Sequence, residues 1–319
     1  MKRFRILVAV LLGMSSHGQT ALVVVPNELA AVEGNAAQRA PFTGPDTPGP
    51  GGEFWDSERY QQVYDASQFG AMAPGGEIIL AIVFRIDSRL GEPFAAVLRN
   101  VQINLSTTQK SADGLSTNFQ ENVGPDEIVA FRGQLEFAGG ISPFDRPQGF
   151  GTSIPSGWFF YRPSAGNLLL DIRVFTYSNS LPATWFDVSS VAGDSISLVA
   201  STNVNSAVGR LSTWGLVTLF HTFPPQALSL TRTNSSLMFS WVDYPRGYRL
   251  ETRDCLDCAL PWQAVAELGT TNDYVREILL PLDTNAPSRF YRLSWKPPPK
   301  AQAADPLAGM PTPAPAKKP

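Results

Sequence analysis

Short apolar runs that recur along the chain, each closed by turn residues, constrain its fold more than any other feature of the sequence. Apolar and polar residues alternate over 101–106 and again over 168–174, which is the two-residue period of a strand with one buried face. The run 78–84 is almost continuously apolar, as in a strand buried on both faces. The 26 glycines and 27 prolines supply turns between such runs and leave little room for long helices. The sequence therefore predicts an all-β protein.

The apolar runs fall into two groups, separated by two consecutive prolines. The first group predicts a jelly-roll-like β-sandwich over residues 22–222, and residues 223–226 are expected to form a stiff linker. The second group predicts a smaller sandwich over 227–296. A chain of 319 residues suits two domains better than one, because a single core seldom grows to that size. The segment 56–66 is the best helix candidate, since its two tyrosines and a valine fall on one helical face.

Both ends of the chain are expected to lie outside these domains. Residues 1–21 have the order of a secretory signal peptide, with basic residues, an apolar core too short to span a bilayer, and then small and polar residues. We therefore expect an exported protein that is secreted, held at the cell surface or kept in the periplasm, with no transmembrane anchor. Residues 297–319 are rich in Pro, Ala and Lys, which predicts a disordered tail.

Three segments of the first predicted domain carry a resemblance to a group of known proteins. Residues 59–64 (RYQQVY), 104–108 (NLSTT) and 161–171 (YRPSAGNLLLD) are similar to segments of secreted bacterial β-sandwich proteins, mostly uncharacterised, which often carry sorting tails of the PEP-CTERM kind. The resemblance covers most of residues 20–222 and implies a sandwich without catalytic motifs. The chain lacks the Pro-Glu-Pro signal, apolar helix and basic stop of those tails, so sorting by that route is not expected.

The second predicted domain has a resemblance of its own. Residues 239–241 (FSW), 248–251 (YRLE) and 290–293 (FYRL), together with Trp262, are similar to the fibronectin-III-like or immunoglobulin-like modules of secreted bacterial proteins. The resemblance implies that these aromatic residues form a core and that the module serves as a spacer or docking unit. It implies no chemistry.

Cys255 and Cys258 form the sharpest local motif, and they are the only cysteines in the chain. A local disulfide is the expected state, because the signal peptide indicates an oxidising compartment. A redox pair needs a strand-to-helix context, whereas this pair lies between two predicted strands. Half a zinc site lacks a second pair of ligands. The redox and metal interpretations remain alternatives.

Aromatic residues near turns are the best indication of a binding surface. Trp158, Tyr161 and Trp185 could stack on sugar rings if their side chains are exposed, and they are core residues if they are not. Loop carboxylates offer a second kind of candidate. Asp113 and the pair Asp126 and Glu127 could gather round calcium, although they match no EF-hand or nonapeptide pattern and a solvated loop is the plainer interpretation.

Several classes of function leave no trace in the sequence. A net charge of −3 without a basic stripe argues against nucleic acid as a partner. Phosphate-binding loops, dinucleotide fingerprints and the Gly-x-Ser-x-Gly elbow are missing, and His221 would be the only histidine left after signal removal, which excludes a multi-histidine zinc site. We expect no cofactor other than calcium.

The sequence therefore favours a non-catalytic binding or structural protein of the cell surface. Its expected partner is a glycan or a cell-envelope protein. An extracellular polysaccharide hydrolase is the first alternative, because the separation of two catalytic carboxylates is a spatial fact that a sequence does not display. A thiol–disulfide protein that acts through Cys255 and Cys258 is the second alternative.

Overall fold

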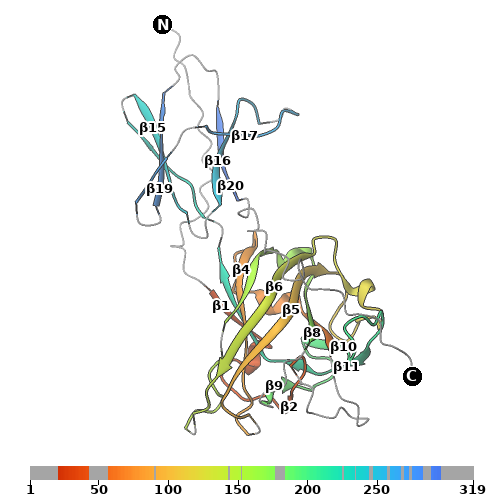
Figure 1. Cartoon of the computed structure of the whole chain (residues 1–319). Coiled ribbons are helices and arrows are strands. Elements are labelled where there is room, and N and C mark those ends of the chain that lie inside the picture. The colour runs from red at the N-terminus through yellow and green to blue at the C-terminus, as the bar shows by residue number, and fades with distance from the viewer. Residues whose placement is uncertain are drawn as a thin grey trace, which may run out of the picture. The chain divides into compact units, whose positions relative to one another are not determined.

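The computed structural model is all-β and divides into two compact units, with the division between Pro225 and Gln226 (Figure 1). That position lies within the segment predicted as the linker. The structure describes residues 21–42, 57–89, 91–142, 144–151, 153–176, 184–224, 226–233, 235–243, 247–256, 259–266, 269–272, 275–282 and 289–295. The predicted C-terminal tail and all but the last residue of the predicted signal peptide lie outside these ranges.

The described residues of the first unit form thirteen strands. They are β1 (Ala21–Val25), β2 (Ala36–Gln38), β3 (Glu58–Tyr64), β4 (Glu77–Phe84), β5 (Phe94–Thr108), β6 (Ile128–Gly139), β7 (Ile154–Tyr161), β8 (Asn167–Thr176), β9 (Phe186–Ser189), β10 (Ile196–Ser201), β11 (Arg210–Ser212), β12 (Gly215–Leu216) and β13 (Thr218–Phe223). The helices of the described residues are four short 3-10 turns, η1 (Asn27–Leu29), η2 (Ala66–Phe69), η3 (Phe119–Asn122) and η4 (Pro163–Ala165). None of these described helices is long and apolar enough to cross a membrane.

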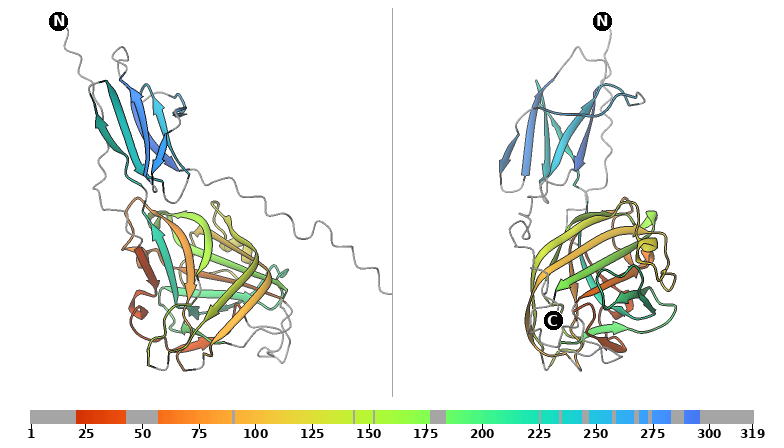
Figure 2. Two further views of the ribbon diagram at one scale, coloured as in Figure 1. Left: turned by 60° about the vertical axis from the view of Figure 1, so that its left-hand side comes forward. Right: turned by 45° about the vertical axis from the view of Figure 1, so that its right-hand side comes forward.

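The strands of the first unit form three antiparallel sheets. A four-stranded sheet has the order β1-β13-β4-β7, a six-stranded sheet the order β11-β10-β3-β8-β5-β6, and a small sheet the order β12-β9-β2. The long strands β5 and β6 lie side by side and curve around one side of the unit (Figure 2). The pairs β3–β8, β4–β7 and β5–β6 are nested in the chain and alternate between the two large sheets, which is the connectivity of a jelly roll. The predicted jelly-roll-like sandwich is confirmed.

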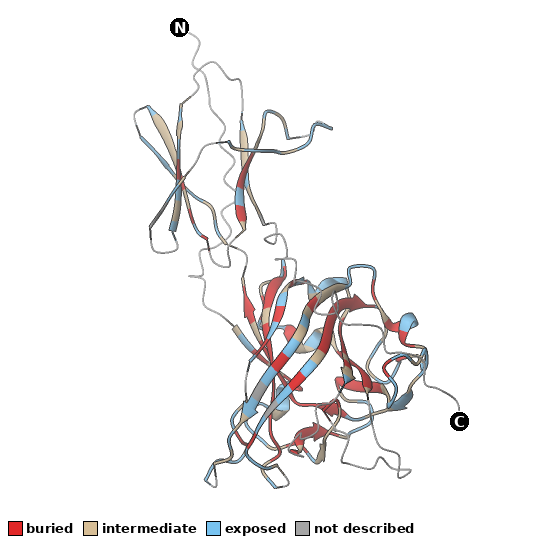
Figure 3. Ribbon diagram, in the orientation of Figure 1, coloured by how far each residue is buried: buried red, intermediate tan, exposed pale blue. Residues whose placement is uncertain are grey.

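Apolar side chains from the two large sheets meet in one core, and buried residues follow these strands in Figure 3. The segment predicted as a helix contributes to this core as strand β3, so that prediction is wrong. Tyr60 and Tyr64 are four residues apart, a spacing that places them on one face of either a helix or a strand. Because β3 pairs with β8 on one side and β10 on the other, its residues alternate between the core and the opposite face.

A buried amide holds the short strand β12 against this core. Gln62 is fully buried on β3, where its Nε2 donates to the carbonyl of Leu216 over 3.0 Å and its Oε1 accepts from the Leu216 amide over 2.8 Å. The side-chain amide of Gln62 thus bonds both the backbone N–H and the backbone C=O of one residue of β12, as a neighbouring strand would. These two bonds satisfy polar groups that would otherwise cost free energy in the core.

Strand β7 contains two consecutive residues in the left-handed region, Gly157 with φ 60° and Trp158 with φ 64°. They lie where the register with β4 shifts, between the partners of Ile79 and Ala81. This bulge turns the edge strand toward β6. A Cβ atom on Gly157 would lie 2.4 Å from the carbonyl oxygen of Ala130, so only glycine fits this close approach.

We therefore expect Gly157→Ala to destabilise the first unit by about 2 kcal/mol, through backbone strain and the contact with β6. Gly140→Ala is the matched control, because a Cβ atom there has nothing within 4 Å. Urea denaturation of the two variants of the intact chain measures the difference. Equal unfolding midpoints would contradict the argument.

The second unit is a smaller sandwich, in which the part of the chain that the structure describes forms seven strands. They are β14 (Ser229–Arg232), β15 (Ser236–Val242), β16 (Tyr248–Arg253), β17 (Gln263–Ala264), β18 (Thr270–Asn272), β19 (Val275–Pro281) and β20 (Phe290–Trp295). The orders β14-β15-β19-β18 and β17-β16-β20 correspond to A-B-E-D and C′-C-F of an immunoglobulin-like sandwich. Its core contains Phe239, Trp241, Tyr248, Leu250 and Ile278, which includes three of the predicted core aromatics.

Candidate functional site

The outward face of the six-stranded sheet carries a set of polar side chains, which we call the polar face. Its members come from four adjacent strands and are Arg59 and Gln61 on β3, Asp171 and Arg173 on β8, Gln102 and Asn104 on β5, and Arg132 on β6. Their neighbours in sequence, among them Tyr60, Ile172 and Ile103, belong to the core, so strand alternation directs the polar set to the other side.

The sheet register arranges the polar face in two rows across the strands. In the first row Arg59 lies opposite Arg173, Arg173 opposite Gln102, and Gln102 opposite Arg132. In the second row Asp171 lies between Gln61 and Asn104. Residues directly opposite each other on adjacent strands have Cβ atoms about 5 Å apart, so each row is a continuous line of side chains.

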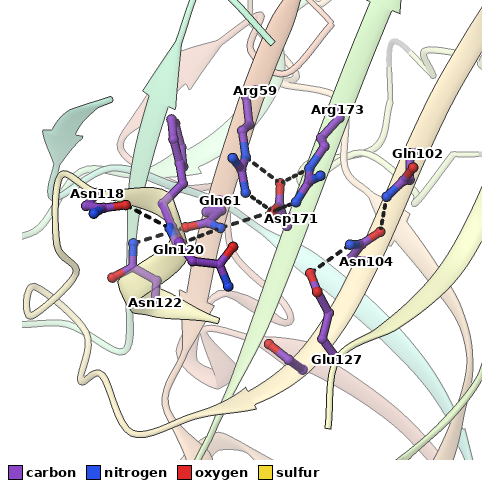
Figure 4. Close-up of polar contacts among 12 residues, drawn as sticks. Arg59, Gln61, Gln102, Asn104, Asn118, Gln120, Asn122, Glu127, Asp171 and Arg173 are labelled. Carbon is purple, nitrogen blue, oxygen red and sulfur yellow. Dashed lines mark hydrogen bonds and ion pairs between the residues drawn. The ribbon is translucent and has the colours of Figure 1, made fainter. Parts of the chain in front are cut away.

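Asp171 is the centre of the polar face (Figure 4). Arg59 donates to its carboxylate from Nη2 over 2.7 Å and from Nε over 3.3 Å, and Arg173 does so from Nη2 over 2.9 Å and Nε over 3.4 Å. Gln61 adds a bond of 3.0 Å from Nε2. One buried carboxylate therefore holds two guanidinium groups that would otherwise repel each other across the β3–β8 pair.

Burial opposes the ionisation of Asp171, yet the hydrogen bonds and charges of Arg59 and Arg173 outweigh it and lower the pKa of this carboxyl below its ordinary value. The same contacts raise the pKa of Arg173, against the opposing effect of burial. Asp171 and Arg173 are therefore both charged near neutral pH. A carboxylate fixed in this way is a poor proton donor, so Asp171 suits an orienting role better than general acid catalysis.

A second series of hydrogen bonds runs along the part of the polar face that β5 forms. Gln102 donates from Nε2 to Oδ1 of Asn104 over 2.9 Å, and Asn104 donates from Nδ2 to Oε1 of Glu127 over 2.7 Å (Figure 4). Gln102 and Asn104 are buried, whereas Glu127 is exposed just before β6 begins. The amides are therefore held in place by their neighbours before any ligand arrives.

The loop of residues 109–127 forms a wall beside the polar face. Its turn η3 places Phe119 in a small apolar cluster on the outward side of the sheet, with Val63, Leu115, Leu169 and Val199. The guanidinium carbon of Arg59 lies 4.4 Å from the centre of the Phe119 ring. This packing covers the apolar part of the outward face. The polar face lies beside it and is not covered by this cluster.

Gln61 fastens that wall to the sheet. Its Nε2 donates to the carbonyl of Phe119 over 3.1 Å, and its Oε1 accepts from Nδ2 of Asn122 over 3.0 Å. Asn118 caps η3 by accepting from the amide of Gln120 over 3.1 Å. The amide contacts of Gln61 thus connect the polar face to the loop of residues 109–127.

The sequence-predicted aromatic residues lie elsewhere. Tyr161 is fully buried, its ring packs against Phe69 at 4.9 Å, and its hydroxyl donates to Gly166, so the prediction that it stacks on a ligand is corrected to a core role. Trp158 and Trp185 are half-buried. Tyr161 lies opposite Glu77, the first residue of β4. The carbonyl of Trp185 instead accepts a hydrogen bond from the amide of Asp87, three residues beyond the other end of that strand. The three therefore do not share one surface.

Arg39 covers the ring of Trp185, with its guanidinium carbon 4.6 Å from the ring centre. This cation–π contact occupies one face of the indole. The predicted ligand role of Trp185 is not needed to account for its position.

The predicted calcium ligands are separated by the fold. Asp113 accepts from the amide of Gly193 over 2.6 Å, and Asp126 accepts from the amide of Thr107 over 2.7 Å. Glu127 instead faces Asn104 on the polar face. Within the described ranges these three carboxylates do not form a ligand cluster.

A different acidic group has ligand-like spacing. Carboxylate oxygens of Glu33, Asp87 and Asp187 lie within 4.8 Å of one another, and this is where a cation could be held among the described residues. Two guanidinium groups already occupy the neighbourhood. Arg85 donates to Asp187 over 2.6 Å and Arg89 to Asp87 over 2.9 Å.

Burial raises the pKa of Asp187 to about 6, although the charge and hydrogen bonds of Arg85 oppose the rise. Arg85 also donates to the carbonyls of Leu29 and Val32, each over 2.7 Å. Its fully buried side chain therefore links the segment after η1 to strands β4 and β9. We interpret this cluster as a structural connection within the fold.

Cys255 lies just beyond β16, and Cys258 lies outside the described residues. The disulfide between them stays a prediction.

Fold and site together define a β-sandwich protein of two compact units, with the hydrogen-bonded polar face on the outward side of its six-stranded sheet. Comparisons of the chain with models of protein families, with curated proteins and with solved structures find no significant match.

Proposed function

We propose that the protein is an exported, non-catalytic binding protein whose polar face binds a carbohydrate. The observation that carries the proposal is the order of this face. Polar side chains on the solvent side of a sheet are common, but here Arg59, Gln102, Asn104 and Asp171 are nine-tenths buried or more and joined by hydrogen bonds. Side chains ordered in advance lose little conformational entropy when a ligand binds.

The chemistry of the polar face matches hydroxyl-rich ligands. Guanidinium groups donate hydrogen bonds, carboxylates accept them, and sugar hydroxyls do both. The donors and acceptors stand on neighbouring strands of one rigid sheet, as a binding site that fixes orientation requires. Asp171 is neutralised by two arginines, which agrees with binding and gives no support to the hydrolase alternative.

Binding of the intact chain to a broad glycan array tests the proposal. We expect Arg173→Ala to weaken binding about tenfold, because it removes a charge-assisted donor from the centre of the first row. Gln102→Ala is a second variant that leaves the Arg59–Asp171 pair in place, and we expect a loss of about threefold. Arg210→Ala is the matched control.

Arg210 is exposed on β11 of the same sheet, opposite Ala200, which contacts the core, so its strand position faces away from the polar set. Binding of the control should equal that of the unmodified chain. An array without any bound glycan, or equal loss in Arg173→Ala and Arg210→Ala, would contradict the proposal.

A further inference from the structure

We infer that the ligand of the polar face is an acidic polysaccharide, specifically one that carries carboxylate groups. The inference rests on the proposed carbohydrate-binding function and adds the chemical class of the ligand. It begins with the first row, in which Arg59, Arg173 and Arg132 flank a single amide, Gln102. Three of the four side chains in this line across four strands therefore carry a guanidinium group.

The charge of this row is only partly compensated within the protein. Asp171 pairs with Arg59 and Arg173 together, and Glu127 makes its hydrogen bond to the amide of Asn104 while its charge also acts on Arg173. Arg132 is exposed and makes no hydrogen bond or ion pair with any residue that the structure describes. An anionic ligand would give Arg132 a charged hydrogen-bond partner.

Each of the two strands beside β5 carries one arginine with a hydrogen-bond donor that is free of the described residues. Arg173 uses Nε and Nη2 for Asp171, its Nη1 bonds to none of the described residues, and 24% of its side chain is exposed. Arg132 stands on the far side of Gln102, about 10 Å away from Arg173 by the spacing of alternate strands. Arginine is suited to carboxylates because its planar fork donates two parallel hydrogen bonds.

The positive charge is local. The whole chain has a net charge of −3, so its overall field repels polyanions and gives them no general affinity for the surface. A polymer that carries carboxylates at intervals can place one group at Arg173 and another at Arg132, with its hydroxyls over the ordered amides Gln102 and Asn104. A neutral glycan would leave Arg132 without a charged partner among the described residues.

Binding of the intact chain to three immobilised polymers tests the inference: a polyuronate, its carboxyl-reduced neutral form and a sulfated dextran. The variant is Arg132→Gln, which removes an exposed charge without breaking a described contact, and Arg210→Gln is the matched control. We expect tightest binding to the polyuronate, about a tenfold loss in Arg132→Gln, and no loss in the control. Binding should also weaken as salt rises from about 0.1 to about 1 M.

Equal binding of the polyuronate and its reduced form would overturn the inference and leave the proposed function standing. Equal binding of the sulfated dextran, with the same loss in Arg132→Gln, would overturn the carboxylate assignment, because the site would then accept any polyanion. Failure of all polymers and of every glycan on the array would overturn both the inference and the proposed function.

Discussion

Replacing Arg85 with methionine is expected to destabilise the first unit by about 3–5 kcal/mol at pH 7, one of the two largest effects that the structure predicts. Arg85 is fully buried and donates to Asp187 from Nε over 2.8 Å and from Nη2 over 2.6 Å. Without it, the carboxylates of Glu33, Asp87 and Asp187 lose one of the two guanidinium groups that contact this cluster, and Arg89 remains. Two backbone carbonyls, of Leu29 and Val32, also lose their donor.

The loss should be smaller at pH 5 than at pH 7. Burial raises the pKa of Asp187 to about 6 in the native chain even against the opposing effect of Arg85, so removal of the arginine raises it further. Asp187 then keeps a proton in the native state that the unfolded chain, with a pKa near 3.8, has released. The native state binds more protons in this interval, so the stability of the variant rises as the pH falls from 7 to 5.

Urea denaturation of the intact chain, with pulse proteolysis as the readout, measures this effect, because the two units leave protected fragments of different size. Arg210→Met is the control, since this exposed arginine makes no ion pair within the described ranges, and its effect should stay within about 0.5 kcal/mol. A variant at Arg85 as stable as the control at pH 7 would show that the buried pair is replaceable by an apolar side chain.

Several strands of the first unit were predictable, because their apolar residues either repeat every second position or form a short continuous run. The runs 78–84, 101–106 and 168–174 all lie within observed strands. Strand β3 was not predictable, because the spacing of Tyr60 and Tyr64 is equally compatible with a helix. In addition, its inward-facing Gln62 breaks the apolar alternation. That amide pairs with β12, which follows it by more than 150 positions, and no local pattern signals such a partner.

The candidate site was less predictable than the fold. Alternation over 101–106 does show that Gln102 and Asn104 share the polar side of a strand. What alternation does not show is which strands are adjacent and in what register, and a shift of one residue would reverse every side chain. Only the observed register brings Arg59 and Asp171, 112 positions apart, into one ion pair.

Aromatic residues were a poor guide to the binding surface for a related reason. Tyr161 and its neighbours in the chain alternate between the core and solvent, so proximity to a turn did not indicate which rings were exposed. Charged residues in the middle of an alternating strand would have been a better signal. Asp171 and Arg173 interrupt the apolar run of β8 two residues apart, and they lie at the centre of the polar face.

Replacing Asp171 with asparagine is the second of the two largest expected effects, with a loss of about 3 kcal/mol at pH 7. The carboxylate is 2% exposed and receives five hydrogen bonds, four of them from Arg59 and Arg173. An asparagine has nearly the same shape but no charge and one acceptor oxygen, so two guanidinium groups would face each other across β3 and β8 uncompensated.

A double-mutant cycle isolates this cause. In a chain that already carries Arg173→Gln, the Asp171→Asn change removes a carboxylate from one arginine instead of two, so it should cost less. The coupling between the two changes is expected to be at least about 1 kcal/mol. Strictly additive costs would mean that Asp171 and Arg173 have no net interaction, which would contradict this argument.

The Asp171→Asn effect should also depend on pH, although the pKa of Asp171 is shifted in the opposite direction to that of Asp187. The native pKa of Asp171 lies below the ordinary value of 3.8, because Arg59 and Arg173 outweigh the burial that opposes ionisation. As the pH falls below about 4, the unfolded chain therefore binds a proton before the native chain does, and the stabilisation that Asp171 provides is progressively lost. The gap in unfolding free energy between the unmodified chain and Asp171→Asn should thus narrow between pH 5 and pH 3.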